Sequence, residues 1–279
     1  MKIKMPIVTF WSNGEEQTGK TLSIAAVATY LSIEHNKRIL IVSTGHNDKT
    51  LDNCFWKERK IKRNLGIFGP NTNIAMDEGI VGLTKIINSN KLSPENITNY
   101  TKIVFKDRLE ILQSFKGERT DYERLKQVYS DIINLANNYY DLVLVDLDRE
   151  LEQEISETIL GNSNLIVANI SQRLSSIDRF IELREQMQFL NTNKTLILVG
   201  RYDKNSKYTI KNMTRYMGEK NKVSTIPYNT LFFEASEEAK VPDLFLKIRN
   251  IDEDDTNYFF LAEVKRTVEN ILYRLEMYR

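Results

Sequence analysis

The segment GEEQTGKT, from Gly14 to Thr21, combines residue types whose spacing is suited to binding phosphate groups. Gly14, Gly19, Lys20 and Thr21 match the pattern G-x-x-x-x-G-K-[ST]. In this pattern the glycines let backbone N–H groups turn inward, the lysine reaches the β- and γ-phosphates of a nucleotide, and the hydroxyl binds Mg²⁺. The start of the helix that follows also attracts anions. The segment therefore predicts a site for nucleotide phosphates and Mg²⁺.

The middle of this loop carries an unusual charge for such a site. Glu15 and Glu16 stand where a polyphosphate would bring its own negative charge, and Gln17 and Thr18 complete the loop. We expect these four residues, and Leu22 in the first turn of the helix, to surround the nucleotide. The alternative, which the two glutamates favour, is a solvated turn that precedes a helix.

The pattern of apolar residues indicates the fold that positions the loop. Short apolar runs recur, and most of them lack the polar–apolar alternation of a half-exposed strand, so they suit strands buried on both faces. The predicted strands occupy residues 6–11, 38–43, 140–146, 163–170, 194–200 and 223–228. Helical patterns occupy residues 19–34, 121–138, 175–190, 209–217 and 256–277, and residues 100–115 suggest a further strand or a hairpin with its turn at 106–108. We therefore expect a doubly wound α/β fold, with a mostly parallel sheet and helices on both faces.

Composition limits the class of protein. The 279 residues are 41% hydrophobic and 28% charged, which excludes a disordered chain, and a net charge of +1 gives no overall attraction to nucleic acid or membranes. One cysteine excludes an internal disulfide and favours a reducing cytoplasm. No run is long and apolar enough for a membrane span. No linker-like segment interrupts the chain, so we expect one domain over residues 1–279.

Several segments resemble the ParA/MinD-like ATPases, a superfamily of P-loop proteins. WSNGEEQTGKTLSIAAVATYLS is similar to the start of these proteins, whose deviant Walker A loop reads K-G-G-x-G-K-[ST], and YYDLVLVDLD is similar to their Walker B strand. SNLIVANISQRLSSIDRF resembles the strand and helix that follow. LILVGRYDKNSKYTIKNMTRYMG and STIPYNTLFFEASEEAKVPDLF resemble the base-binding end, most of all in the pilus-assembly members of TadZ/CpaE type.

This resemblance implies roles for residues far from the loop. Asp146, at the end of LVLVD, corresponds to the Walker B aspartate that holds Mg²⁺ through water, although an aspartate can also simply cap a strand end. Arg201 and Asp203 match the motif N-R-x-D, which walls the adenine of ATP, with Gly200 in place of the asparagine. Pro227 and Tyr228 match the loop that closes over the base, or they form a strand-terminating turn. Lys20 and Asp146 are thus the expected catalytic residues, and Thr21 and Asp146 the expected metal ligands.

Two departures from the family bear on hydrolysis. Glu15 stands where the family has a signature lysine that reaches the nucleotide of the opposite subunit. Ser43 and Gly45 stand near the positions of two aspartates, one of which orients the attacking water, and no carboxylate follows until Asp48. Because phosphoryl transfer depends on positioning and on cancelling charge, we expect ATP binding to survive better than turnover.

Three further stretches carry weaker signals. The basic run KERKIKR, residues 57–63, could contact DNA, acidic lipid or a partner protein, but such runs are usually solvated surfaces. The acidic residues 252–255 precede a helix, whose positive end they suit better than a metal ion. The last helix mixes acidic and basic residues, so we expect it to pack on the domain or on a second subunit rather than on a membrane.

Together these features predict a cytoplasmic protein that binds ATP and Mg²⁺, forms a homodimer across its nucleotides, hydrolyses ATP slowly or not at all, and organises a pilus or secretion assembly. A partner protein could recruit it to the inner face of the membrane. The alternatives are a partition-type protein that associates with DNA and a structural scaffold that binds no nucleotide.

The replacement Glu15→Lys is expected to tighten ATP-dependent dimerisation. In a dimer formed across its nucleotides, a unit charge about 5 Å from a phosphate is worth roughly 3 kcal/mol at an effective dielectric near 20, and less with solvent screening. Glu15→Ala removes the repulsion without adding attraction, so its effect is expected to be modest. Sedimentation with and without a non-hydrolysable ATP analogue measures both. A weaker dimer for Glu15→Lys would mean that Glu15 makes a specific subunit contact and that its comparison with the lysine is wrong.

Overall fold

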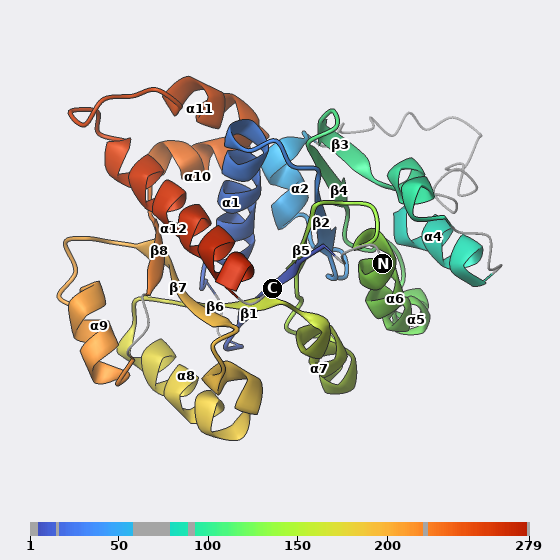
Figure 1. Cartoon of the computed structure of the whole chain (residues 1–279), viewed down its shortest axis with the longest axis horizontal. Coiled ribbons are helices and arrows are strands. Elements are labelled where there is room, and N and C mark those ends of the chain that lie inside the picture. Colours follow the sequence, from blue (N-terminus) through green and yellow to red (C-terminus); the bar gives the residue numbers. More distant parts are fainter. Residues whose placement is uncertain (1–4, 15–16, 58–78, 89–92, 220–222, 278–279) are drawn as a thin grey trace, which may run out of the picture.

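An eight-stranded sheet forms the centre of the computed structural model, which describes residues 5–14, 17–57, 79–88, 93–219 and 223–277 (Figure 1). The strand order is β3-β4-β2-β5-β1-β6-β7-β8. Every neighbouring pair is parallel except β3 and β4. The strands are β1 (Ile7–Ser12), β2 (Ile39–Ser43), β3 (Lys102–Phe105), β4 (Leu109–Leu112), β5 (Leu142–Asp146), β6 (Leu165–Ile170), β7 (Thr195–Tyr202) and β8 (Ser224–Pro227).

The central strands form where the sequence is continuously apolar. Successive side chains of a strand point to opposite faces, so a strand covered on both sides must be apolar throughout. Every residue of β2, β5 and β6 is buried, as the sequence predicted. Of the two possibilities expected for residues 100–115, a strand or a hairpin, the structure has the hairpin: β3 and β4 pair antiparallel, and Asp107 in their turn has a left-handed φ of 59°.

Helices cover both faces of the sheet. The helices given below as the first group pack against one face of the sheet, where α1 and α12 lie side by side (Figure 1). The other face packs against the second group. The first group is α1 (Lys20–Glu34), α2 (Thr50–Phe55), α10 (Thr230–Glu237), α11 (Val241–Ile248) and α12 (Tyr258–Met277), and the second is α4 (Gly79–Asn88), α5 (Arg119–Leu125), α6 (Tyr129–Ala136), α7 (Gln153–Asn162), α8 (Leu174–Gln186) and α9 (Ile210–Tyr216).

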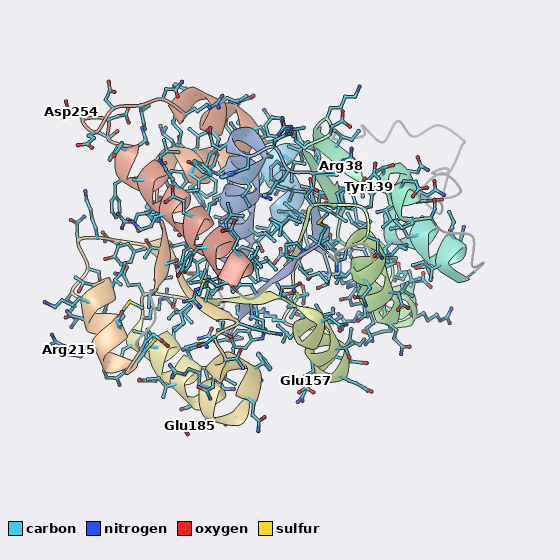
Figure 2. The ribbon with its side chains drawn as sticks, viewed as in Figure 1. Arg38, Tyr139, Glu157, Glu185, Arg215 and Asp254 are labelled. Atoms are coloured by element: carbon cyan, nitrogen blue, oxygen red, sulfur yellow. The ribbon has the colours of Figure 1, made fainter. Side chains whose placement is uncertain are left out.

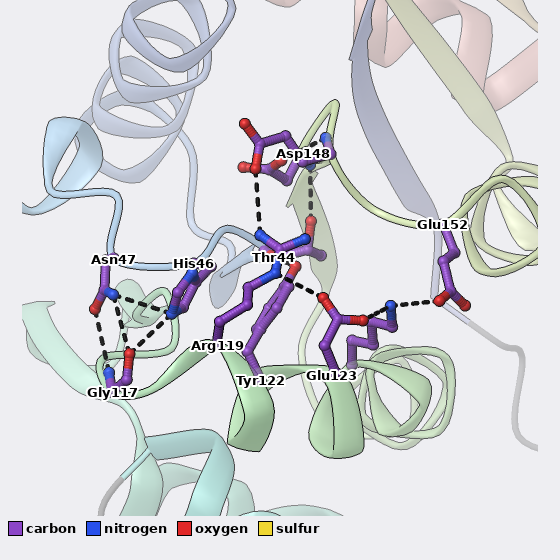
Figure 3. Close-up of polar contacts among 11 residues, drawn as sticks. Thr44, His46, Asn47, Gly117, Arg119, Tyr122, Glu123, Asp148 and Glu152 are labelled. Carbon is purple, nitrogen blue, oxygen red and sulfur yellow. Dashed lines mark hydrogen bonds and ion pairs between the residues drawn. The ribbon is translucent and has the colours of Figure 1, made fainter.

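The helix expected over residues 121–138 is wrong as a single element. It consists of α5 and α6, separated by the 3₁₀ turn η2 (Lys126–Val128). Lys126 is buried there and forms ion pairs with Glu123 and Glu152, so this turn packs against the start of α7 (Figure 3). The helix expected over 175–190 likewise ends at Gln186, and the 3₁₀ turn η3 (Gln188–Asn191) follows it. A further 3₁₀ turn, η1 (Pro94–Tyr100), precedes β3.

The charged side chains lie mainly on the outside of these layers. Glu157, Glu185, Arg215 and Asp254 are exposed and extend from the helices and loops at the periphery (Figure 2). The last helix packs on α1 and β8, as expected, and buries eight residues along one side. Among the described residues, no helix combines the length and the apolar character needed to cross a membrane.

Candidate functional site

The phosphate-loop sequence connects the end of β1 to the start of α1. Gly14, Gln17 and Gly19 have left-handed φ values of 83°, 63° and 74°, which turn the backbone tightly before the helix. Gly19 is the N-cap of α1 and offers no side chain to bond the first N–H groups, and the first turn holds no acidic residue. The open, positive end of the helix is therefore available to an anion. Glu15 and Glu16 lie outside the described residues.

Lys20 and Asp146 meet beneath this loop. The ammonium Nζ of Lys20 is 2.7 Å from Oδ1 of Asp146 and also donates a hydrogen bond to the carbonyl oxygen of Leu147. The two side chains are 13% and 4% exposed, so the ion pair lies almost entirely inside the protein. Asp146 is the last residue of β5, and Phe10 of β1 is its register partner, which places the aspartate at the strand edge from which the loop leaves.

A cavity of about 430 Å³, called the phosphate cavity below, opens beside Lys20. Every residue from Gln17 to Leu22 lines it, so this part of the loop and the first turn of α1 face the same space. Lys20, Arg149 and Arg201 contribute positive charge, whereas Asp48, Asp148 and Glu237 contribute carboxylates; Ser12, Thr50 and Phe233 complete the lining. A cavity with converging cations, hydroxyls and helix N–H groups suits a phosphorylated ligand.

Gly200 explains one departure from the family motif. A Cβ built on Gly200 would lie 2.1 Å from the carbonyl oxygen of Thr18, a distance at which no side chain fits. A Cβ on Gly19 would in turn lie 3.1 Å from Cγ of Arg201. The phosphate loop therefore rests directly on the backbone of β7, and the glycine is required by this contact.

The same contact shapes Arg201. The register between β7 and β8 shifts between Gly200 and Tyr202, so Arg201 is the extra residue of a β-bulge, with a left-handed φ of 53°. Left-handed conformations of residues other than glycine are uncommon and cluster at functional sites. The bulge directs Arg201 to the phosphate cavity and also to two neighbouring cavities.

The four predicted base-binding residues lie around these neighbouring cavities. Arg201, Asp203 and Tyr228 line a cavity of about 540 Å³, and Arg201, Pro227 and Tyr228 line a small one of about 20 Å³ that also touches Gly19. Tyr228 is 53% exposed, and its ring centroid is 6.4 Å from that of Phe233. The structure thus brings Arg201, Pro227 and Tyr228 next to Gly19 of the phosphate loop, and Asp203 shares the larger cavity with Arg201 and Tyr228.

Gln172, at the end of β6, holds the loop that carries Asp203. Its side chain accepts a hydrogen bond from the backbone N–H of Asp203 at 2.8 Å and donates to the carbonyl oxygens of Asp203 and Tyr208. The carboxylate of Asp203 accepts a hydrogen bond from the N–H of Asn205 within the same turn. Residue types alone gave no signal for Gln172, because its role depends on the contact between two strand ends.

Asp148 is the functional candidate that the sequence interpretation missed. It follows β5 by two residues and lines the phosphate cavity beside Asp48. Burial raises the pKa of the Asp148 carboxyl, while the hydrogen bond from the N–H of Glu150 and the charge of Lys20 oppose that shift. Its position two residues beyond a Walker B-like aspartate, at a strand end, is the signal that could have identified it.

The remaining sequence signals lie apart from this site. Of the basic run 57–63, only Lys57 is described; it is exposed in a groove beside Phe55 and Trp56. Asp255 accepts a hydrogen bond from the N–H of Asn257 in the turn before α12, in keeping with a role at a helix start. No group of three or more His, Cys, Asp or Glu residues suited to a metal ion occurs within the described residues.

Comparisons with known proteins identify the fold. No protein-family model and no curated protein matches the chain. A ParA family ATPase from Chlorobium tepidum TLS superposes with a TM-score of 0.68 at 16% identity over 95% of this chain and 96% of its own. The cell division ATPase MinD of Pyrococcus furiosus gives 0.65 at 13% over 96% and 100%. A putative plasmid partition protein from Borrelia burgdorferi B31, bound to AMPPNP, gives 0.62 at 18% over 98% and 99%.

These similarities establish the architecture. The chain has the doubly wound α/β fold of the ParA/MinD-type P-loop ATPases, as the sequence predicted.

The substitution Gly200→Ala tests the contact between β7 and the phosphate loop. The new methyl group cannot fit 2.1 Å from the Thr18 carbonyl, so the loop must move. We expect a loss of about 1–3 kcal/mol in the free energy of unfolding, as for other overpacked sites. We also expect at least a tenfold weaker affinity for Mg-ATP. Urea denaturation and calorimetric titration measure the two effects.

Gly161→Ala is the matched control, because nothing lies within 4 Å of a Cβ at that helical position. It should leave nucleotide affinity unchanged. Equal affinities for Gly200→Ala and the wild type would show that the loop does not depend on this contact.

Proposed function

We propose that the protein binds Mg-ATP in the cavity under the phosphate loop. The observation that carries this proposal is the juxtaposition of Lys20 and Asp146 beneath an uncapped helix N-terminus, at the edge of a fold shared with ParA/MinD-type ATPases. A P-loop lysine and a strand-ending aspartate are the groups that such a site uses for phosphate and metal. A solvated turn would not enclose the lysine so completely.

The positive charge of Lys20 is already neutralised by a carboxylate in this structure. Lys20 is paired with Asp146, so phosphate oxygens that bind Lys20 must compete with the carboxylate. Thr21 lines the cavity, and Asp146 is paired with Lys20 of the same lining; the hydroxyl and the carboxylate are hard oxygen donors, the kind that Mg²⁺ prefers together with phosphate oxygens and water. These two residues would hold the metal, Asp146 through water, and the metal would neutralise charge on the phosphates.

We assign the base to the end of the site formed by β7 and β8. Arg201 lines both the phosphate cavity and the larger neighbouring one, so it can contact a ligand that extends from one to the other. Asp203, Pro227 and Tyr228 form the walls of this second region. Aromatic and guanidinium planes suit a purine base, against which they can stack.

At the cellular level we propose a nucleotide-dependent homodimer that organises a pilus or secretion assembly. This proposal is supported by the resemblance of the two base-binding segments to pilus-assembly ATPases. The protein would act in the cytoplasm as one P-loop domain, and a partner would bring it to the inner face of the membrane.

The second candidate is a DNA-associated partition protein. One solved structure with the same fold is a putative plasmid partition protein, and the basic run 57–63 offers positive charge. Salt-dependent retardation of DNA that is lost when residues 57–63 are neutralised would favour this candidate. Complete failure to bind ATP would favour a structural scaffold.

Lys20→Ala is expected to weaken Mg-ATP binding ten- to hundredfold. The substitution removes a charge-assisted contact worth roughly 1.5–3 kcal/mol. Calorimetric titration of Mg-ATP measures the effect, with the exposed Lys211→Ala as control. Because the substitution also leaves buried Asp146 without its cation, thermal unfolding of the variant must be recorded alongside. Equal dissociation constants for the wild type and Lys20→Ala would rule out this loop as the site.

Turnover by the wild type is expected to stay below about 1 s⁻¹ at saturating Mg-ATP, the low end of enzyme rates. Glu15 replaces a lysine that would cancel transition-state charge, and neither Ser43 nor Gly45 provides a carboxylate for the attacking water. Phosphate release under single-turnover conditions measures the rate directly. A faster rate would show that the chain compensates for both departures.

A further inference from the structure

The phosphate cavity contains a carboxylate whose position depends on Gly45. A Cβ built on Gly45 would lie 3.0 Å from Oδ2 of Asp148 and 3.2 Å from Cβ of Asp48. These separations are shorter than ordinary van der Waals contact, so the carboxylate of Asp148 occupies the space that a side chain at position 45 would need. The φ angle of Gly45 is not left-handed, so its backbone conformation does not require a glycine.

Hydrogen bonds fix the backbone that carries this carboxylate. The N–H of Asp148 donates to Oγ1 of Thr44 at 2.8 Å, and the N–H of Thr44 donates to the carbonyl oxygen of Asp146 at 3.1 Å (Figure 3). The hydroxyl of Tyr122 donates to the carbonyl oxygen of Thr44 at 2.6 Å. The ends of β2 and β5 are thereby tied together, with α5 supporting them from the outside.

The two oxygens of Asp148 have different surroundings. Oδ1 accepts a hydrogen bond from the N–H of Glu150 at 2.7 Å, which holds the carboxylate in one orientation. Oδ2 is the oxygen next to Gly45, in the wall of the cavity that Lys20 and Thr21 also line. Asp146, by contrast, is already occupied by Lys20.

We propose that Asp148 is a catalytic residue that orients the attacking water in ATP hydrolysis. This inference rests on the proposed function, because it requires ATP in the cavity. The water oxygen forms a bond to the γ-phosphorus while the bond from the γ-phosphorus to the β–γ bridging oxygen breaks, and that electron pair leaves with ADP. Asp148 accepts a hydrogen bond from the water and holds it in line, and the proton released by the water ends on inorganic phosphate.

Asp48 is the competing carboxylate in the same wall. Its Oδ1 accepts a hydrogen bond from the N–H of Thr50 at 2.8 Å at the start of α2, and its carbonyl oxygen accepts one from the hydroxyl of Ser114. Asp48 thus belongs to the start of α2, whereas Asp148 follows the strand that carries the Walker B-like aspartate. Oδ2 of Asp148, and only Cβ of Asp48, lies next to Gly45, so the geometry favours Asp148 as the residue that contacts the water.

Single-turnover release of phosphate from radiolabelled Mg-ATP tests this assignment. Asp148→Asn keeps the shape of the side chain and is expected to slow release at least about 100-fold, the size of effect that follows from misplacing a reacting group. The dissociation constant for Mg-ATP should stay within about threefold of the wild type, because we assign binding to Lys20 and Thr21. Glu150→Gln is the control: it is an adjacent, exposed carboxylate and should change neither quantity.

Gly45→Ala provides a second variant that retains the carboxylate. Its methyl group would displace Oδ2 of Asp148, so release should slow while ATP remains bound. If Asp148→Asn does not fold, as judged by thermal unfolding, Gly45→Ala decides the question.

Three results would overturn the inference: wild-type rates for both variants, a comparable loss in Asp48→Asn with none in Asp148→Asn, or a wild type that binds ATP but releases no phosphate. A wild type that does not bind ATP contradicts the proposed function itself.

Discussion

The ion pair between Lys20 and Asp146 is the interaction on which the arrangement of the site depends. It joins the first residue of α1 to the last residue of β5, and it is almost fully buried. Removing one partner of a buried pair typically costs about 3–5 kcal/mol, because the other charge is left without compensation. Each partner therefore keeps the other in place, and together they hold the phosphate loop at the edge of the sheet.

The pair also sets the electrostatic condition for any ligand. A phosphate group that takes Lys20 leaves Asp146 with a negative charge in a poorly solvated place, which favours a bound cation near that carboxylate. Nucleotide and metal should therefore bind cooperatively rather than independently. Asp148 adds a second carboxylate close to Lys20, which increases the negative charge that a bound cation would offset.

Much of the fold could be predicted from the sequence because its signals are local. Six strands coincide with short, mostly apolar runs, and the phosphate loop is defined by residue types at fixed spacing, so both were recognised without knowledge of distant contacts. Two contacts could not be predicted in this way: Gly200 lies against Thr18, and the carboxylate of Asp148 occupies the space beside Gly45. They join segments more than 100 residues apart, and a glycine in the sequence does not say which backbone or side chain approaches it. The interruption at Lys126 was missed because one of its ion pairs is with Glu152, the residue before α7, and this contact is not visible in the local sequence pattern.

The position of β1 in the sheet has a consequence for how the chain folds. Ile7 pairs with Val143 of β5, and Val8 pairs with Leu165 of β6, so β1 is completed by strands that are synthesised much later. Such distant pairings slow folding, because a long loop must close before any contact is gained. At about 5–20 residues per second of synthesis, β1 waits roughly 7–30 s for its partners. Its apolar side chains are without their sheet during that time, so β1 exposes apolar surface that favours aggregation until its partners arrive.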